Sequence, residues 1–382
     1  MRSISSLLRW CFCTLSMLGV LVTAQDKPAQ SPPPLAPLVS PEVHSDGSVT
    51  FRFRGPNAVE VKLAREGAEP VPMQKDDQGV WIMTTSLSPD YYGYSFVADG
   101  VRLIDPQNPL LIPNLLTPAS AVHVPGPSSL HWELNDVPHG EIHHHFYSSK
   151  VAGDDRDYYV YTPAGYDPVA KKTYPVLYLL HGFSDDASGW TAVGHANVIL
   201  DNLIAQGKAK SMIVVMPLGY GTMEFVHLGW DAWNHTEVRD RNFDKFREAL
   251  LTEVMPQVES EYRITKGGNE RAIAGLSMGG SESLLTGLNH LDKFSWVGAF
   301  SSGGISDDFQ KDFPALDARA NQQLHLLWIA CGTEDRLIAV NRNLREWLKS
   351  KGVKATGIET SGMHTWMVWR RNLAEFAPLL FR

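Results

Sequence analysis

Cysteine is scarce in this sequence, with three among 382 residues. Cys11 and Cys13 lie in an apolar N-terminal segment and lack the flanking pattern of a lipidated cysteine. If that segment is a leader that is removed, Cys331 is the only thiol left, and one thiol cannot form an internal disulfide. The hydrophobic core must then supply the stability of the folded protein.

Basic clusters and long apolar runs are missing as well. The formal net charge is −8, and it becomes −10 when the two arginines Arg2 and Arg9 leave with the leader. An acidic chain without a basic cluster argues against nucleic acid and anionic membranes as partners. Beyond the N-terminal segment, no apolar run approaches the length needed to span a bilayer. Nothing in the sequence indicates the oligomeric state.

The N-terminus has the three parts of a secretory signal peptide, over residues 1–24. Arg2 and Arg9 form its basic region, Trp10 to Val22 its apolar region, and small residues precede a cleavage site. The apolar region is too short for a membrane anchor. We therefore expect a secreted or periplasmic protein without membrane contact after cleavage. Residues 25–37 are rich in proline and are expected to form an extended linker.

Residues 38–126 contain short runs that alternate apolar and polar positions, separated by turn signals such as Asp99-Gly100. Runs of this length and spacing predict a small antiparallel β-sandwich. The region resembles the immunoglobulin-like, CBM48-type module that precedes some carbohydrate-active enzymes. The resemblance is carried by Phe51 to Asn57, Gly79 to Trp81, Tyr92 to Gly100 and Asp105 to Pro109. It implies sugar binding; the alternative is a spacer or lid that packs on the domain that follows.

From about residue 130 to residue 382, strand patterns alternate with helix patterns. Tyr174 to Leu180 and Leu324 to Ala330 are typical of buried strands, and Phe243 to Tyr262 is typical of a long amphipathic helix. This alternation predicts an α/β fold with a doubly wound sheet and helices on both faces. Pro125 to Pro127 is a plausible boundary with the preceding sandwich.

A candidate nucleophile lies in the segment Gly275-Leu276-Ser277-Met278-Gly279, which has the pattern G-x-S-x-G. An apolar run, Ala272 to Ala274, precedes it, and a helix pattern, Ser281 to Leu288, follows it. A strand, a tight turn and a helix in this order predict a nucleophile elbow, in which the serine hydroxyl stands clear of the sheet. The alternative is a glycine-rich turn whose serine only caps the helix.

An α/β-hydrolase fold requires an acid and then a histidine after the elbow, each in a loop that follows a strand. Asp335 follows the strand pattern that ends near Ala330, and His364 follows a later one. We expect His364 to accept the proton of Ser277 and Asp335 to hold the imidazole in the required tautomer. Glu334 is the competing acid.

The oxyanion hole needs two backbone N–H donors. We assign them to Met278, next to the nucleophile, and to Phe183, in the loop after an early strand. His181 is expected to orient that loop. The loop Gly221 to His235 should lie over the pocket, where Trp230 and Trp233 either stack on a phenolic ring or a sugar, or only anchor the loop.

Neither a metal nor a cofactor is expected. His143, His144 and His145 are consecutive in a strand pattern, so their side chains point to opposite faces and cannot converge on one ion. The glycines form no phosphate loop and no dinucleotide fingerprint.

Residues 140–382 resemble the esterase D-like group of carbohydrate esterase family 1, which includes feruloyl, acetyl xylan and siderophore (enterochelin) esterases. The shared segments are His181-Gly182, Gly275 to Gly280, Cys331 to Asp335 and Gly362 to His364. The resemblance implies Ser277, Asp335 and His364 as the triad. It also implies an ester substrate, often a hydroxycinnamoyl or acetyl group on plant polysaccharide. The segment Gly221 to His235 departs from the group's pattern, so the acyl specificity stays open.

The predicted function is that of an exported serine ester hydrolase, most like a feruloyl esterase, acting on acylated polysaccharide or a small ester. The alternatives within hydrolases are an acetyl xylan esterase and a siderophore esterase. An acyltransferase and a carbohydrate-binding protein with an inactive hydrolase domain are alternatives of other classes. Because all proposed catalytic residues lie after residue 130, we expect a fragment of residues 128–382 to keep activity on small esters.

Overall fold

The computed structural model describes residues 37–306 and 308–382, and Leu38–Arg382 form one compact unit. The predicted signal peptide and nearly all of the predicted linker lie outside the described residues. Within residues 37–306 and 308–382, no helix has both the length and the hydrophobicity required to cross a membrane.

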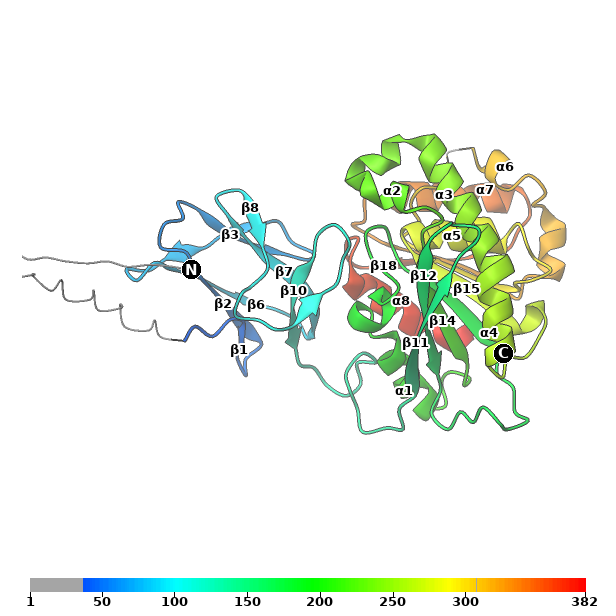
Figure 1. Cartoon of the computed structure of the whole chain (residues 1–382), viewed down its shortest axis with the longest axis horizontal. Helices are drawn as coiled ribbons and strands as arrows, with labels where there is room; N and C mark the ends of the chain where they lie inside the picture. The colour runs from blue at the N-terminus through cyan, green and yellow to red at the C-terminus, as the bar shows by residue number, and fades with distance from the viewer. Residues whose placement is uncertain (1–36, 307) are drawn as a thin grey trace, which may run out of the picture. The chain divides into compact units, whose positions relative to one another are not determined.

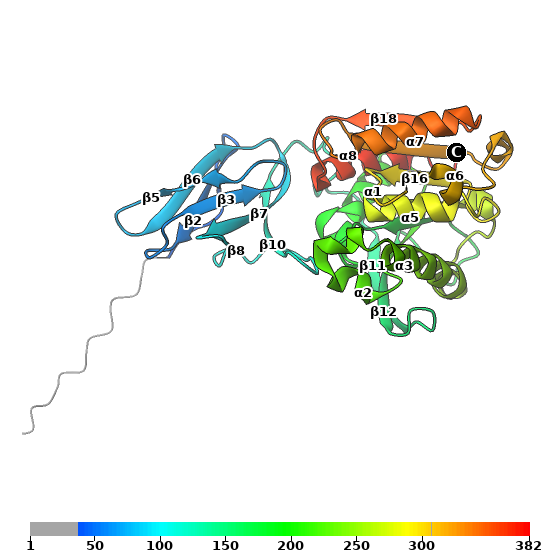
Figure 2. The same ribbon diagram turned by 90° about the horizontal axis from the view of Figure 1, so that it is seen from above.

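The described residues before 126 form two antiparallel sheets (Figures 1 and 2). One has the order β1 (Glu42–Val43), β2 (Ser48–Arg54), β6 (Val80–Ser86), β5 (Gln74–Lys75). The other has the order β4 (Val71–Pro72), β3 (Val61–Arg65), β7 (Asp90–Ala98), β10 (Ala119–Val124), β9 (Leu111–Ile112), and β8 (Val101–Leu103) pairs with β7. Alternate residues such as Phe51, Leu63 and Phe96 share one buried core, as the period of two along a strand requires. The immunoglobulin-like and CBM48-type assignments stay predictions.

The rest of the chain is organised around one eight-stranded sheet (Figure 1). Its order is β11 (Glu141–Ser148), β12 (Asp155–Thr162), β14 (Ile213–Pro217), β13 (Val176–Leu180), β15 (Arg271–Leu276), β16 (Trp296–Phe300), β17 (Leu326–Gly332), β18 (Thr356–Thr360). Pairing is antiparallel among β11, β12 and β14 and parallel from β14 to β18. The central strands are buried on both faces, as a parallel sheet covered by helices should be.

Helices cover both faces of this sheet, and each face has its own apolar core. Leu177 and Leu179 of β13 face a core shared with α1 (Ala196–Ala205) and α8 (Trp366–Phe376). The alternate residues face a core shared with α3 (Thr236–Ala249), α4 (Met255–Glu261), α5 (Met278–Gly287), α6 (Phe309–Asp312) and α7 (Ile338–Ser350). This is an α/β-hydrolase-like arrangement, as the alternating patterns predicted.

Two segments differ in detail from the prediction. The long helix expected over Phe243 to Tyr262 is α3 and α4 joined by a short π-helix, η3 (Leu250–Val254). The segment Gly221 to His235, predicted as a loop, folds into α2 (Met223–His227) and the 3-10 helix η2 (Gly229–Asn234). Thr222 caps α2, because its hydroxyl oxygen accepts a hydrogen bond from the amide of Glu224. Helices this short have too few residues to display a period in the sequence.

Candidate active site

Ser277 lies in the tight turn between β15 and α5. Its backbone has φ 51° and ψ −114°, a conformation that L-residues rarely adopt. A Cβ added to Gly275 would lie 2.5 Å from the backbone of Gly279, and one added to Gly279 would lie 2.5 Å from the carbonyl oxygen of His181. Both glycines are therefore required by the close approach of strand, turn and helix.

Ser277, His364 and Asp335 form a continuous hydrogen-bonded chain. The distance from Ser277 Oγ to His364 Nε2 is 3.0 Å, and the distance from His364 Nδ1 to Asp335 Oδ2 is 2.7 Å. An ionised carboxylate can only accept, so Nδ1 carries the proton and Nε2 is free to accept one from the serine hydroxyl. The arrangement can therefore activate Ser277 as a nucleophile.

Asp335 is 2% exposed. Burial raises the pKa of Asp335, but the hydrogen bond and charge of His364 and the amide of Leu337 outweigh it and leave that pKa below its usual value. Glu334 is exposed, and its carboxylate contacts the hydroxyl of Thr333 instead of His364. The competing acid is thus in a position that does not reach the imidazole.

The loop that carries Phe183 passes beside the nucleophile. A Cβ built on Gly182 would lie 3.5 Å from the Cβ of Ser277. His181 is buried, and its Nδ1 donates to the carbonyl of Gly182 while its Nε2 accepts the amide of Gly219, both at 2.8 Å. Burial lowers the pKa of His181, which favours the neutral ring that these two bonds require. His181 therefore fixes the loop, the role that its sequence position predicted.

Asn114 and Tyr220, which come from other segments of the chain, hold the same loop. The sequence analysis predicted a role for neither. Asn114 Nδ2 donates to Ser184 Oγ at 2.9 Å and to Asp185 Oδ1 at 3.2 Å. The Tyr220 hydroxyl accepts from the Ser184 amide at 2.7 Å. These partners lie 36 to 71 positions apart in the chain, and no local pattern marks such a distant contact.

Burial of Asp185 in this loop predicts a pH-dependent stability. Burial raises the pKa of Asp185 to about 8, so the folded protein holds a proton there that the unfolded chain releases above about pH 4. The free energy of unfolding should therefore fall as the pH rises from about 4 to about 8. This group contributes at most about 1.4 kcal/mol per pH unit to that fall. Asp185→Asn should flatten the dependence, measured by urea unfolding at pH 5, 6 and 7. The neighbouring Asp186→Asn is the control, and equal slopes in wild type and Asp185→Asn would contradict the prediction.

A cleft of about 1010 Å³ opens above Ser277. Trp230 and Trp233 both line it, and their ring centroids lie 5.3 and 5.2 Å from that of Phe183. Trp233 also packs on Phe225, whereas Trp230 is 53% exposed. Trp233 thus anchors its segment, and Trp230 has a ring surface available to a ligand.

Residues from the strands and turns before residue 126 line the same cleft, among them Glu66, Ser95 and Asn114. The Leu115 amide also donates to the carbonyl of Ser184 at 2.7 Å. A fragment of residues 128–382 would lose these contacts. Ser277, Asp335 and His364 all lie within this fragment, and its activity on small esters stays a prediction.

The three consecutive histidines occupy the edge strand β11, where each has a different partner. His143 contacts Thr162, His144 contacts Asp157, and His145 contacts Tyr262. Among residues 37–306 and 308–382, no group of three or more His, Cys, Asp or Glu side chains has an arrangement that could hold a metal ion.

Residues 149–380 match the model of an esterase family described as "Putative esterase". The chain belongs to this esterase family. The esterase is thus a carboxylic ester hydrolase similar to those of carbohydrate esterase family 1, as the sequence motifs predicted.

Known relatives of this esterase include an "Endo-1,4-beta-xylanase/feruloyl esterase" of Xylanibacter ruminicola, 31% identical over 351 residues. The match covers 90% of this chain but only 46% of the relative, so the chain spans less than half of that protein's length. A CE1 ferulic acid esterase of Anaeromyces mucronatus is 26% identical, with a TM-score of 0.57 over 67% of this chain and 96% of that one. The enterobactin esterase of Shigella flexneri shares the fold, with 19% identity and a TM-score of 0.65 over 87% of this chain and 92% of that one.

Proposed function

We propose that this esterase is an exported serine hydrolase that removes feruloyl-type acyl groups from plant polysaccharide or its fragments. The observation that carries the proposal is the hydrogen-bonded chain from Ser277 through His364 to Asp335 at the bottom of an aromatic-lined cleft. The relatives named as feruloyl esterases support the acyl group. Export rests on the N-terminal sequence pattern alone.

In the proposed reaction, Ser277 Oγ attacks the ester carbonyl carbon while His364 Nε2 takes its proton. His364 then gives that proton to the departing sugar oxygen, and the acyl group stays on Ser277. Water next attacks the acyl-enzyme with His364 as base, and the collapse of the tetrahedral intermediate releases the acid and restores the serine hydroxyl. Asp335 stabilises the imidazolium that forms in both halves.

The oxyanion of each tetrahedral intermediate is proposed to accept hydrogen bonds from the amides of Phe183 and Met278. The Met278 amide is the first of α5, where the unpaired N–H groups and the helix dipole favour a negative charge. The fixed loop around Gly182 keeps the second donor in place before the reaction starts, which is the main source of such stabilisation.

Assays of the purified protein on methyl ferulate, acetylated xylan and a ferric-siderophore ester test the substrate class. We expect methyl ferulate to be cleaved with the highest kcat/KM. A preference for either of the other two would replace the feruloyl assignment by that ester. Product analysis with an added alcohol should yield free acid; transfer of the acyl group to the alcohol would indicate an acyltransferase. Absence of any turnover, p-nitrophenyl acetate included, would leave a binding protein.

Trp230→Ala should weaken binding of an aromatic acyl group. Loss of one ring contact lowers the binding free energy by about 0.5–1.5 kcal/mol, so KM for methyl ferulate should rise roughly 2- to 10-fold. Ethyl acetate, which has no ring, should be hydrolysed as by the wild type. Leu228→Ala is the matched control, since Leu228 is a partly exposed side chain of the same segment. An equal loss on both esters would assign Trp230 to loop anchoring.

A further inference from the structure

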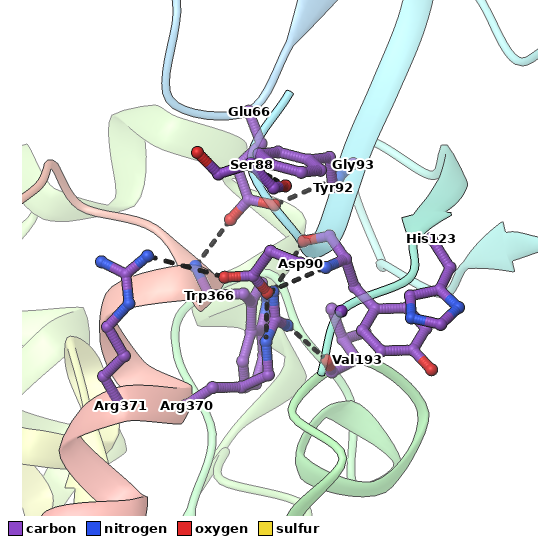
Figure 3. Close-up of polar contacts among 12 residues, drawn as sticks. Glu66, Ser88, Asp90, Tyr92, Gly93, His123, Val193, Trp366, Arg370 and Arg371 are labelled. Atoms are coloured by element: carbon purple, nitrogen blue, oxygen red, sulfur yellow. Dashed lines mark hydrogen bonds and ion pairs between the residues drawn. The ribbon is translucent and has the colours of Figure 1, made fainter. Parts of the chain in front are cut away.

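Helix α8 begins at Trp366, two residues after His364, so its first turn sets where the imidazole can lie. The N-cap residue Thr365 provides no side-chain hydrogen bond to this turn. The missing cap comes instead from Glu66, in the turn directly after β3. Glu66 Oε1 accepts the hydrogen bond of the Trp366 amide at 2.6 Å, across 300 positions of the chain (Figure 3). A carboxylate is a strong acceptor for the unpaired amides of a helix N-terminus.

The Glu66 carboxylate is itself held in place by the sheet. Its Oε2 accepts from the amide of Gly93 in β7 at 3.2 Å, and its own amide donates to the Gly93 carbonyl at 2.8 Å (Figure 3). A side chain fixed at both carboxylate oxygens has few other positions to adopt. It therefore transmits the position of β7 to the start of α8.

Gly67, the residue after Glu66, packs against the first turn of α8. Gly67 has φ +73°, and a Cβ added to it would lie 2.9 Å from the methyl group of Met367. Met367 packs in turn against the apolar core of the N-terminal sheets. The turn after β3 and the first turn of α8 are thus in direct contact through both backbone and side chains.

A buried ion pair holds α8 one turn further on. Arg370 and Asp90 have side chains that are 0% and 1% exposed, and the shortest distance between them is 2.6 Å (Figure 3). Arg370 also donates to the carbonyls of Val193 and Tyr91. With most of its donors paired, the guanidinium ties this part of α8 to β7, and Glu66 adds a separate contact at the first turn.

We propose that Glu66 is a positioning residue for His364: by capping α8 it holds the preceding loop so that the imidazole stays within hydrogen-bond reach of Ser277. The N-terminal sheet thereby completes an active site whose three proposed catalytic residues all lie in the other part of the chain. The inference rests on the proposed triad. A misplacement of the base by about 1 Å is enough to cost roughly 100-fold in rate.

The test compares Glu66→Ala, Glu66→Gln and the control Glu60→Gln in the full chain. Glu60 is an exposed acid just before β3 that pairs with Lys62. Labelling with an active-site fluorophosphonate is run to completion, and the labelled fraction gives the number of competent serines. The kcat for p-nitrophenyl acetate is then expressed per labelled serine. We expect Glu66→Ala to lower this kcat roughly 10- to 100-fold with KM within about twofold. Glu66→Gln should lose much less, because its carbonyl oxygen can still accept the Trp366 amide. Glu60→Gln should match the wild type.

A spectroscopic readout separates positioning from stability. The proton between His364 Nδ1 and Asp335 should give a low-field NMR signal that is shifted or broadened in Glu66→Ala and unchanged in Glu60→Gln. If the activity of Glu66→Ala falls only in proportion to the amount of labelled protein, its kcat per labelled serine is that of the wild type, and the inference is overturned. If Ser277→Ala is inactive while Glu66→Ala is normal, this inference alone fails; if Ser277→Ala is active, the proposed function fails.

Discussion

Ser277→Ala is expected to abolish ester hydrolysis and to leave the fold intact. The hydroxyl is the only atom group lost, and no acyl-enzyme can form without it. Removal of a triad nucleophile should lower kcat on the order of 10⁴- to 10⁶-fold. The residual rate should come from the oxyanion hole and from binding alone. The measurement is kcat for methyl ferulate and p-nitrophenyl acetate, with circular dichroism and thermal unfolding to check the fold.

Ser283→Ala is the matched control for this experiment. Ser283 lies in α5, the helix that follows Ser277, is buried, and donates its hydroxyl to the carbonyl of Gly279 at 2.7 Å. Its loss should cost some stability, of the order of 1 kcal/mol, and little activity. Near-wild-type turnover by a clean preparation of Ser277→Ala would exclude Ser277 as the nucleophile and with it the proposed mechanism.

The elements that carry the triad could be predicted because their signals are local. Gly275 and Gly279 flank Ser277 at fixed spacing, and the strand and helix on either side have distinct periods. Ser277, Asp335 and His364 each follow a strand. Their meeting in space follows from the topology of a parallel sheet, where all these loops lie at one edge. The close approach of Gly182 to Ser277 follows from the same rule, because β13 and β15 are neighbours in parallel.

The contacts that hold the active site in place could not be predicted, because they form between segments that are distant in the sequence. Glu66 is one acidic residue among 42 Asp and Glu, and only the contact between the turn after β3 and the first turn of α8 gives its carboxylate the Trp366 amide as a partner. Asn114 likewise gains its role from a loop 70 positions later. Glu66 lies in a turn and Asn114 in a loop, where polar residues are ordinary. The prediction that the catalytic residues lie after residue 130 did not include these contacts.

Asp335→Asn is expected to be the second most damaging change, with Glu334→Gln as its matched control one residue away. The Asp335 carboxylate, whose pKa is held below its usual value, is ionised near neutral pH and accepts a hydrogen bond from Nδ1–H of His364. An asparagine amide can instead donate to Nδ1, which moves the ring proton to Nε2 and leaves no acceptor for the Ser277 hydroxyl. The loss of kcat should approach roughly 10⁴-fold.

Glu334→Gln should stay within about twofold of the wild type, because its exposed side chain contacts Thr333 and not the imidazole. Steady-state kinetics on p-nitrophenyl acetate from pH 6 to 9 measure both variants. A partial recovery of Asp335→Asn at high pH, where hydroxide can replace the missing base, would support the tautomer argument. The reverse ranking of the two variants would assign the triad acid to Glu334. That outcome would require the loop after β17 to adopt, in the working enzyme, a conformation that turns Asp335 away from His364.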